Sequence, residues 1–277
     1  MDRIWLIGGT SESGEIAREL ASRGIPCTIS VTTEAAKSLY PESPHLKIWV
    51  GKLDRVSIEG FIRRERIVAI LDASHPYAAA VSELAIATAQ QYHLPYLRFE
   101  RPVVGNEEGN KGGSDRHVLH LPSFEALLTG DYLSGKRVLL IVGYQILPRF
   151  QPWQGRSTLF ARLLPSQIAL ETALAARFTP DRLIALRPPI SAELEAALWR
   201  QWQITTVVTK ASGKAGGEDV KRRVAAELGV RLVIIDRPVL SYPQETREVA
   251  EAVRFCRQNI STDNAGLKEK GEGERGI

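Results

Sequence analysis

Two glycine-rich turns contain the residue types and spacings that best suit anion binding. The first, GGTSE at residues 8–12, follows a short apolar run at residues 3–7 and precedes a helical pattern. The second, TKASGKAGG at residues 209–217, follows an apolar run at residues 204–208 and precedes a helical pattern at residues 217–228. Glycine allows backbone N–H groups to approach a ligand closely, and the following helix directs its positive end toward phosphate or carboxylate. Both turns are therefore predicted to bind anions.

Neither turn matches a standard nucleotide-binding motif in full. The first has Thr10 where the dinucleotide fingerprint has its middle glycine, and the lysine and hydroxyl of the second stand in the wrong order for a Walker loop. A purely structural turn, or a flexible connection with solvated lysines, is the alternative for each. The position of the first turn, directly after the first predicted strand, favours a nucleotide site because open α/β sheets bind phosphates there.

A third segment, DASHPYA at residues 72–78, follows a strand-like run and combines an acid, an imidazole and a phenol. His75 and Tyr77 are the candidates for donating a proton or orienting a substrate, because both can titrate or hydrogen-bond in a partly dehydrated site. The alternative is ordinary helix entry, with Ser74 as the cap and Pro76 in the first turn.

Two further segments, RFERP at residues 98–102 and DRP at residues 236–238, place arginines directly after apolar runs. The planar guanidinium group suits carboxylates and phosphates, so these arginines are candidates for binding an anionic ligand. A solvated arginine at the rim of a sheet is the alternative, because exposed cations are the norm.

The elements that would position these segments alternate between strands and helices in both halves of the chain. Strands are predicted at residues 3–7, 27–31, 46–50, 68–71, 95–98, 137–142, 158–163, 183–187, 205–209 and 231–235. Helices are predicted at residues 14–23, 34–40, 56–64, 77–92, 166–177, 191–202, 217–228 and 244–259, with Ser166 and Ser191 as N-caps. This alternation predicts an α/β fold of two Rossmann-like domains, each a mainly parallel sheet flanked by helices, with a ligand cleft between them.

The chain length of 277 residues suits two domains. We predict one at residues 1–122 and the other at residues 123–260, followed by a disordered polar tail at residues 261–277 that has too few apolar residues to order itself. The glycine-rich segment at residues 105–116 is predicted to be a mobile surface loop that could act as a lid.

Composition limits the classes of partner. The formal net charge is +4 and the basic residues are dispersed, so nucleic acid is not an expected partner. Cys27 and Cys256 lack metal-site spacing and are predicted to be buried thiols, and no metal site is expected. The amino terminus lacks the features of a signal peptide, and no stretch reaches the length of a membrane helix. A cytoplasmic protein without a membrane partner, as a monomer or a weak homo-oligomer, is expected.

Six segments together resemble the precorrin-6A reductase family of corrin-ring biosynthesis, which includes cobalt-precorrin-6A reductases. They are GGTSE at residues 8–12, DASHPYA at 72–78, RFERP at 98–102, LFARLLP at 159–165, TKASGKAGG at 209–217 and DRP at 236–238. The resemblance implies an oxidoreductase acting on a CH-CH group. Such an enzyme transfers hydride from a nicotinamide cofactor to the macrocycle of precorrin-6A, and protonation of the adjacent carbon gives precorrin-6B.

The resemblance also suggests roles for individual residues. His75 and Tyr77 are the expected catalytic residues. The expected cofactor residues are Gly8, Gly9, Thr10, Ser11, Glu12, Thr32, Thr33, Asp72, Ala73 and Ser74. A polycarboxylate tetrapyrrole is expected to meet Arg98, Arg101, Ser191, Lys210, Ser212, Gly213, Gly216, Gly217 and Arg237. Which of the two glycine turns binds cofactor and which binds substrate stays open. Glu195, where the family commonly has asparagine, and Tyr144, where a small hydroxyl-bearing turn is usual, depart from the family pattern.

The choice of coenzyme depends on the segment after the second predicted strand. Thr32 and Thr33 could bond a 2′-phosphate and Lys37 could neutralise it, which favours NADPH, whereas Glu34 could hold a ribose hydroxyl and keeps NADH as an alternative. Two other functions fit the same fold. One is an enzyme that uses a nucleotide sugar or S-adenosylmethionine, and the other is a non-catalytic protein that binds a dinucleotide or a tetrapyrrole.

Overall fold

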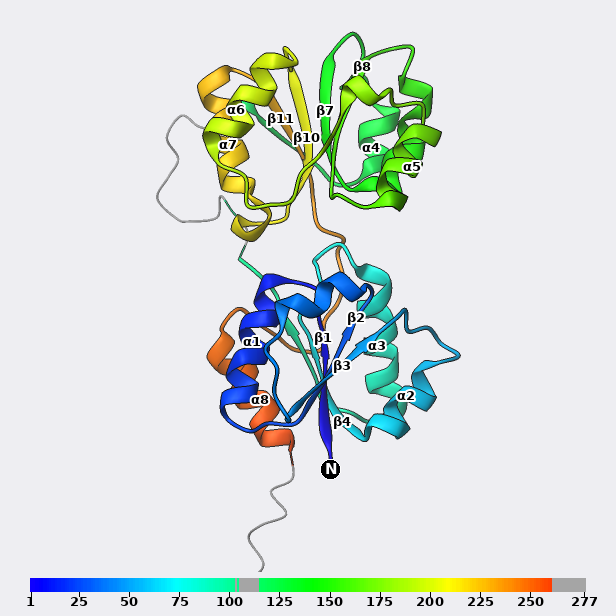
Figure 1. Cartoon of the computed structure of the whole chain (residues 1–277), viewed down its shortest axis with the longest axis vertical. Coiled ribbons are helices and arrows are strands. Elements are labelled where there is room, and N and C mark those ends of the chain that lie inside the picture. The colour runs from blue at the N-terminus through cyan, green and yellow to red at the C-terminus, as the bar shows by residue number, and fades with distance from the viewer. Residues whose placement is uncertain (103, 105–114, 261–277) are drawn as a thin grey trace, which may run out of the picture. The chain divides into compact units, whose positions relative to one another are not determined.

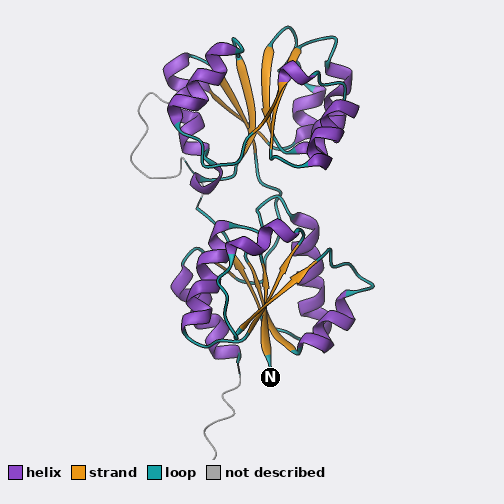
Figure 2. Cartoon of the chain, viewed as in Figure 1, coloured by secondary structure: helices purple, strands orange, loops and turns teal. Residues whose placement is uncertain are grey.

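The structure is a computed structural model that describes residues 1–102, 104 and 115–260. It divides into two compact units, of which the first comprises Met1–Glu100 with the chain from Leu240 onward, and the second comprises Arg101–Val239. Each unit is a parallel sheet between layers of helices (Figure 1, Figure 2). The predicted α/β class with two parallel sheets is therefore confirmed.

The sheet of the first unit has the strand order β12-β5-β4-β1-β2-β3, with every pair parallel. Its strands are β1 (Arg3–Ile7), β2 (Cys27–Val31), β3 (Leu46–Val50), β4 (Ile67–Asp72), β5 (Tyr96–Phe99) and β12 (Glu245–Thr246). The helical segments are α1 (Ser11–Ser22), η1 (Glu34–Leu39), α2 (Ile58–Glu65), α3 (Ala79–Tyr92) and α8 (Val249–Asn259), where η denotes a 3-10 helix.

Alternate residues of β1 show why this strand is apolar throughout. Ile4 and Leu6 pack with α1 and α8 on one face of the sheet, whereas Trp5 and Ile7 pack with α2 and α3 on the other. A strand covered on both faces must be apolar at successive positions, which is the run that the sequence shows.

The sheet of the second unit has the strand order β6-β11-β10-β7-β8-β9, again with every pair parallel. Its strands are β6 (Val118–Leu121), β7 (Arg137–Ile141), β8 (Thr158–Leu163), β9 (Leu183–Ala185), β10 (Thr206–Lys210) and β11 (Arg231–Ile235). The helical segments are η2 (Asp115–His117), α4 (Phe124–Thr129), η3 (Tyr144–Trp153), α5 (Gln167–Ala175), η4 (Pro180–Arg182), α6 (Ala192–Gln201), η5 (Lys214–Gly216) and α7 (Glu218–Leu228).

The division of the chain differs from the predicted boundary at residue 122. β6 pairs with β11 and so belongs to the second unit, which already begins at Arg101. After Val239 the chain returns to the first unit, where β12 pairs with β5 and α8 packs against α1. An amphipathic pattern shows that a helix has a buried face, but it does not say which sheet that face covers. The sequence therefore predicted the last helix but assigned it to the other domain.

All ten predicted strands are present. The elements that were not predicted are β6, β12, α4, η2, η3, η4 and η5. The predicted lid at residues 105–116 lies outside the described residues except for residues 115 and 116, which begin η2, and the predicted tail at residues 261–277 lies wholly outside them. Among the described residues, no helix combines the length and apolar character needed to cross a bilayer, and no group of three His, Cys, Asp or Glu side chains is placed to hold a metal ion. Cys27 and Cys256 are buried free thiols, and burial raises the pKa of Cys27 to about 12.

Candidate functional site

Two of the predicted segments meet at the carboxyl edge of the first sheet. β1 and β4 are neighbouring parallel strands, so the GGTSE turn after β1 and the DASHPYA segment after β4 leave the sheet side by side. The Thr10 hydroxyl joins them, because its Oγ1 donates to the carbonyl oxygen of Ala73 at 2.9 Å. Open parallel sheets bind ligands at this edge.

The glycine turn needs glycine at two positions for different reasons. Gly9 has a φ of 98°, which favours glycine, and the space that a Cβ would enter there is open. At Gly8 a Cβ would lie 2.2 Å from the hydroxyl oxygen of Tyr40. Gly9 is therefore where a ligand can approach the backbone, whereas Gly8 is required by the packing of the turn itself.

Tyr40, which sequence reasoning did not single out, completes this turn. Its hydroxyl accepts a hydrogen bond from the Gly9 N–H at 2.7 Å and lies 2.9 Å from Ser13 Oγ. Burial raises the pKa of Tyr40. Thr10 and Ser13 form a capping box at the start of α1, which also occupies the Thr10 N–H. The Gly9 and Thr10 amides are thus used within the protein, which differs from the expectation that they face a phosphate.

Asp72 occupies the centre of a buried polar network at the end of β4. It is 0% exposed. Its Oδ1 accepts from the Ser74 N–H and from Arg98 Nη1, each at 3.0 Å, and its Oδ2 accepts from the hydroxyls of Ser82 at 2.6 Å and Tyr96 at 2.9 Å. The expected contact between Asp72 and the cofactor does not fit this burial. Asp72 instead stabilises the segment that follows β4, through its hydrogen bond with the Ser74 N–H.

Arg98 also has a different position from the one expected. It is 1% exposed, pairs with Asp72 and Glu100, and lies over the ring of Tyr242 at 5.2 Å. Desolvation alone would lower its pKa, but the two carboxylates outweigh that effect and raise it. Ser74, another expected cofactor residue, is buried and accepts from Arg98 Nη1 at 3.1 Å. Arg98 is therefore a buried network residue, not a ligand-facing cation.

His75 and Tyr77 lie in the turn that this network supports. Both are half-buried, and their ring centroids are 5.8 Å apart. His75 Nδ1 accepts from the Tyr77 backbone N–H at 3.2 Å, so the neutral imidazole carries its proton on Nε2. The helix α3 begins only at Ala79, with Ala78 as its N-cap, so Ser74 is not the cap. The two candidate catalytic side chains are thus held ahead of the helix at the carboxyl edge.

The segment expected to select the coenzyme lies at the same edge, after β2. Thr32 and Thr33 are exposed. Lys37 and Glu34 in η1 form an ion pair at 2.8 Å. Ser11 and Glu12 occupy the first turn of α1, where the Ser11 hydroxyl donates to Glu12 Oε2 at 3.0 Å.

In the second unit the structure brings four of the expected substrate residues together around the turn after β10. Arg101 Nη1 donates to the carbonyl oxygen of Ser212 at 2.9 Å. Arg237 donates through Nη1 to the carbonyl oxygen of Arg101 at 2.8 Å. Gly213 has a φ of 72°, and its Cβ position lies 3.3 Å from the Arg101 side chain. Both arginines therefore bind backbone carbonyl oxygens of this region, which the sequence did not predict.

The remaining expected substrate residues have separate settings. Lys210 is half-buried at the end of β10 with its Nζ 5.8 Å from the centroid of the Phe124 ring, and burial lowers its pKa. Gly216 lies against Ser212, because a Cβ there would be 1.9 Å from the Ser212 hydroxyl oxygen. Ser191 is the N-cap of α6, as predicted, and accepts from the Leu194 N–H. β7 and β8 separate the strand before Ser191 from the strand before the glycine turn.

Two buried charged residues next to the glycine turn were missed by sequence reasoning. Glu218 and Lys221 belong to α7, are 0% and 1% exposed, and both contact the turn. Charged residues in an amphipathic helix usually face solvent, so the sequence pattern of α7 did not predict that Glu218 and Lys221 are buried.

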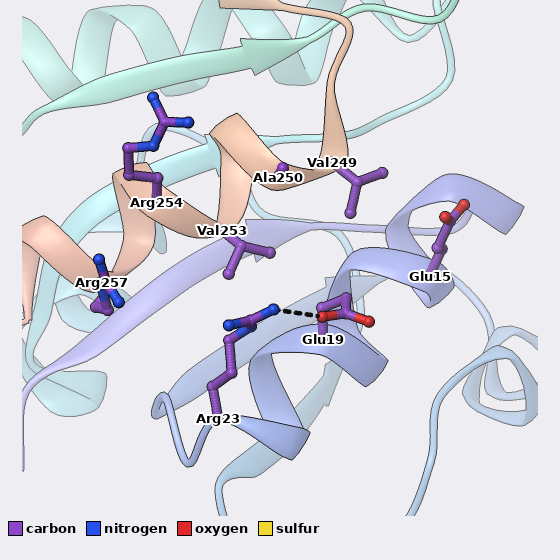
Figure 3. A pocket seen from close by; sticks show the side chains of 8 residues that line it. All are labelled: Glu15, Glu19, Arg23, Val249, Ala250, Val253, Arg254 and Arg257. Carbon is purple, nitrogen blue, oxygen red and sulfur yellow. Dashed lines mark hydrogen bonds and ion pairs between the residues drawn. The ribbon is translucent and has the colours of Figure 1, made fainter.

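A pocket of about 390 Å³ lies in the helical layer of the first unit, between α1 and α8 (Figure 3). Its charged lining consists of Glu15, Glu19, Arg23, Arg254 and Arg257, and Arg23 pairs with Glu19 across 3.1 Å. None of the expected site residues lines it. The carboxyl edges of the sheets are therefore better candidates for the chemistry than this pocket.

The amino-acid sequence and the fold of this chain are similar to those of known proteins. The model of the precorrin-6x reductase CbiJ/CobK family matches residues 3–257. A cobalt-precorrin-6A reductase of Synechocystis sp. is 45% identical over 260 residues, covering 93% of this chain and 97% of that protein. A cobalt-precorrin-6A reductase of Priestia megaterium is 29% identical over 250 residues, covering 86% of this chain and 92% of that protein.

A solved structure of the CobK precorrin-6A reductase has a TM-score of 0.75 at 24% identity, covering 95% of this chain and 99% of that one, and shows that the fold is shared. The family match extends over both sheets and over all six segments that carried the resemblance. This chain therefore belongs to the precorrin-6x reductase CbiJ/CobK family.

Proposed function

We propose that this chain is a nicotinamide-dependent reductase of cobalamin biosynthesis, which reduces precorrin-6A or its cobalt complex to the corresponding precorrin-6B. The observation that carries the proposal is the 45% identity, over nearly the whole of both chains, with a relative named cobalt-precorrin-6A reductase. The carboxyl edges of the two sheets carry the glycine turns. The half-buried His75 and Tyr77 lie at the edge of the first sheet, and Lys210 lies at the edge of the second.

The first unit suits the nicotinamide nucleotide. Gly9 offers open space beside an exposed backbone, and α1 directs its N-terminus to the same edge. Because the Gly9 amide is already bonded to Tyr40, the phosphates would meet the backbone N–H groups of the first turn of α1, which begins at Ser11. The bound nicotinamide would supply the hydride. Thr10 and Tyr40 keep the shape of the turn, so little reorganisation is needed when the nucleotide binds.

We further propose that NADPH is preferred to NADH. Thr32 and Thr33 are exposed hydroxyls at the carboxyl end of β2, and Lys37 is the neighbouring cation. A 2′-phosphate would compete with Glu34 for the Lys37 ammonium group. Glu34→Ala should therefore lower the KM for NADPH, whereas Lys37→Ala should raise it, and neither should change the KM for NADH. Equal effects on both coenzymes would contradict this assignment.

The second unit suits the polycarboxylate macrocycle. Lys210 and Lys214 lie on either side of the Gly213 turn. A substrate with several acetate and propionate groups requires several cations, which an apolar pocket would not provide. Desolvation of Lys210 makes its charge more effective, because an ion pair strengthens as the surrounding dielectric falls.

Reduction of a macrocycle double bond requires a proton as well as a hydride. The His75 imidazole can pass a proton from Nε2 while water returns one to the ring, since its Nδ1 is held by the Tyr77 backbone N–H. Tyr77 supplies a second donor in the same turn. Asp72 accepts a hydrogen bond from the Ser74 N–H at the start of this turn. The backbone that carries His75 and Tyr77 is therefore fixed in position.

The direct test is to mix purified protein with NADPH and precorrin-6A and to follow both the nicotinamide absorbance and the macrocycle spectrum. Loss of one NADPH per macrocycle reduced is expected, with no loss when the macrocycle is omitted. Binding of both ligands without turnover would indicate a non-catalytic binding protein. Turnover that requires a nucleotide sugar or S-adenosylmethionine instead of NADPH would indicate a different enzyme class.

A further inference from the structure

Glu218 forms an unusual contact with the glycine turn of the second unit. Its Oε2 accepts from the Gly213 N–H at 3.0 Å, although Glu218 is the first residue of α7 and is 0% exposed. A carboxylate of the protein itself thus lies at the N-terminus of this helix, where the helix dipole favours an anion. Gly213 has a φ of 72°, so this contact fixes the turn at its glycine-requiring residue.

A chain of polar side chains holds Glu218 in place. Glu218 Oε1 accepts from Arg222 Nε at 3.1 Å and Nη2 at 3.0 Å. Arg222 Nη2 also lies 3.1 Å from His120 Nε2, and His120 Nδ1 lies 2.7 Å from Asp236 Oδ1. Because arginine can only donate, His120 Nε2 accepts and Nδ1 donates to Asp236. Residues of β6, of α7 and of the segment after β11 therefore all support one backbone N–H.

Lys221 holds the other end of the turn. Its Nζ donates to the carbonyl oxygens of Gly216 at 2.6 Å and Gly217 at 3.1 Å. Lys221 is 1% exposed, and burial together with the charge of Arg162 lowers its pKa to about 8. An ammonium group is costly to bury, and an apolar side chain would fill this position at lower cost. The lysine is explained by the two carbonyl oxygens that it fixes.

We propose that Glu218 and Lys221 are positioning residues, which preset the turn at residues 213–217 so that the flanking cations Lys210 and Lys214 meet carboxylates of the macrocycle. This inference rests on the proposed function and deepens it. Glu218 fixes the amide at one end of the turn and Lys221 fixes the carbonyl oxygens at the other end, so the turn keeps its shape before the substrate arrives. Neither side chain is exposed, so both act through the backbone of the turn and not by touching the substrate.

Steady-state kinetics of Glu218→Gln and Lys221→Met test the proposal. In Glu218→Gln the amide nitrogen faces either the Gly213 N–H or Arg222, so one of these hydrogen bonds is lost while the side-chain shape is kept. We expect each variant to raise the KM for the macrocycle by about tenfold, as expected for loss of a hydrogen bond to a charged group. The kcat and the KM for NADPH should stay within about twofold, because the turn that meets NADPH belongs to the first unit.

Matched controls come from the same helix. Glu227 and Arg223 are exposed and pair with each other at 3.9 Å, so Glu227→Gln and Arg223→Met remove a carboxylate and a cation of the same helix without touching the turn. Both controls should leave all kinetic constants unchanged. Thermal unfolding and NADPH binding of each variant show whether it is folded, and Glu218→Gln carries the test if Lys221→Met does not fold.

The possible outcomes separate this inference from the function. An unchanged macrocycle KM in folded Glu218→Gln, or a parallel rise in the KM values for NADPH and macrocycle, would overturn the positioning role. Absence of NADPH-dependent reduction by the unmodified chain would instead overturn the proposed function.

Discussion

Asp72 and Arg98 occupy paired positions at the carboxyl ends of β4 and β5, and their side chains form a buried ion pair at 3.0 Å. The register of the two parallel strands brings the two charges together, although 26 positions separate them in the chain. The pair lies beneath the turn that carries His75 and Tyr77. It therefore links the stability of the first unit to the geometry of the candidate proton donors.

Replacing Arg98 by methionine should destabilise the first unit strongly. Removing one partner of a buried ion pair leaves an uncompensated charge, here on Asp72, and costs about 3–5 kcal/mol. Denaturant unfolding of Arg98→Met measures this loss. Arg254→Met, which removes an exposed arginine of the same unit, is the control and should change the free energy of unfolding by less than about 0.5 kcal/mol. Normal stability with a raised macrocycle KM would instead favour a ligand-binding role for Arg98.

Thr10→Val should separate the two segments that its hydroxyl joins. The substitution removes the N-cap of α1 and the hydrogen bond to Ala73, and loss of a helix cap typically costs about 1 kcal/mol. We expect a lower melting temperature and a higher KM for NADPH. Thr10→Ser keeps the hydroxyl and should behave like the unmodified protein. If Thr10→Val leaves NADPH binding unchanged, the turn after β1 is not part of the cofactor site.

His75→Ala should slow the chemical step more than Tyr77→Phe does. A positioned general acid typically contributes about 10²–10⁴-fold to the rate, and His75 Nε2 carries the proton. Tyr77→Phe keeps the backbone N–H that orients the imidazole, so it should reduce the rate only slightly. Single-turnover kinetics with excess enzyme measure the chemical step directly. If neither variant slows the reaction, bound water is the proton donor.

The buried amine of Lys221 should make stability increase with pH in a defined window. Its pKa is about 8 in the folded chain, against the ordinary lysine value of 10.5 in the unfolded chain. Below pH 8 it is therefore protonated in both states, and the full cost of burying the charge is present. Between pH 8 and 10.5 the folded chain binds fewer protons than the unfolded chain, and stability rises with pH. At about 1.4 kcal/mol per pKa unit, this contribution amounts to about 3 kcal/mol.

Comparison with Lys221→Met isolates this contribution. The other titrating groups are common to both proteins and cancel in the difference. The gap between the two free energies of unfolding should shift by about 3 kcal/mol across the window in favour of the unmodified protein. Parallel pH profiles would show that the ammonium group carries no burial penalty.

The sequence predicted the strands well because a sheet covered on both faces requires apolar runs. β1, β2, β3, β8 and β11 have the predicted limits. β12 was missed because a strand of two residues has no measurable periodicity, and η3 was missed because Pro148 and Pro152 interrupt the helical pattern. The return of the chain to the first unit could not be deduced, because hydrophobic patterns do not identify the partner that a face covers.

For the site, the sequence identified the segments more reliably than the roles of their side chains. The turns at Gly9 and Gly213 lie at the carboxyl edges, where glycine after a strand predicts them. Arg98 was expected to face a ligand, but it forms an ion pair with Asp72 at the end of the preceding strand. Opposite charges at the ends of two successive strands were the signal from which this pair could have been predicted. Glu218 and Lys221 had no such signal, because burial of a charge depends on neighbours that are distant in the chain.

The interrupted course of the first unit bears on synthesis of the protein. Ile4 and Leu6 are translated before the second unit, but α8, which covers their face of the sheet, is translated only after the whole second unit. In a nascent chain that has reached Val239 the second unit can be complete while one apolar face of the first unit is still uncovered. Premature termination at that point would yield an aggregation-prone fragment, because α8 would be missing.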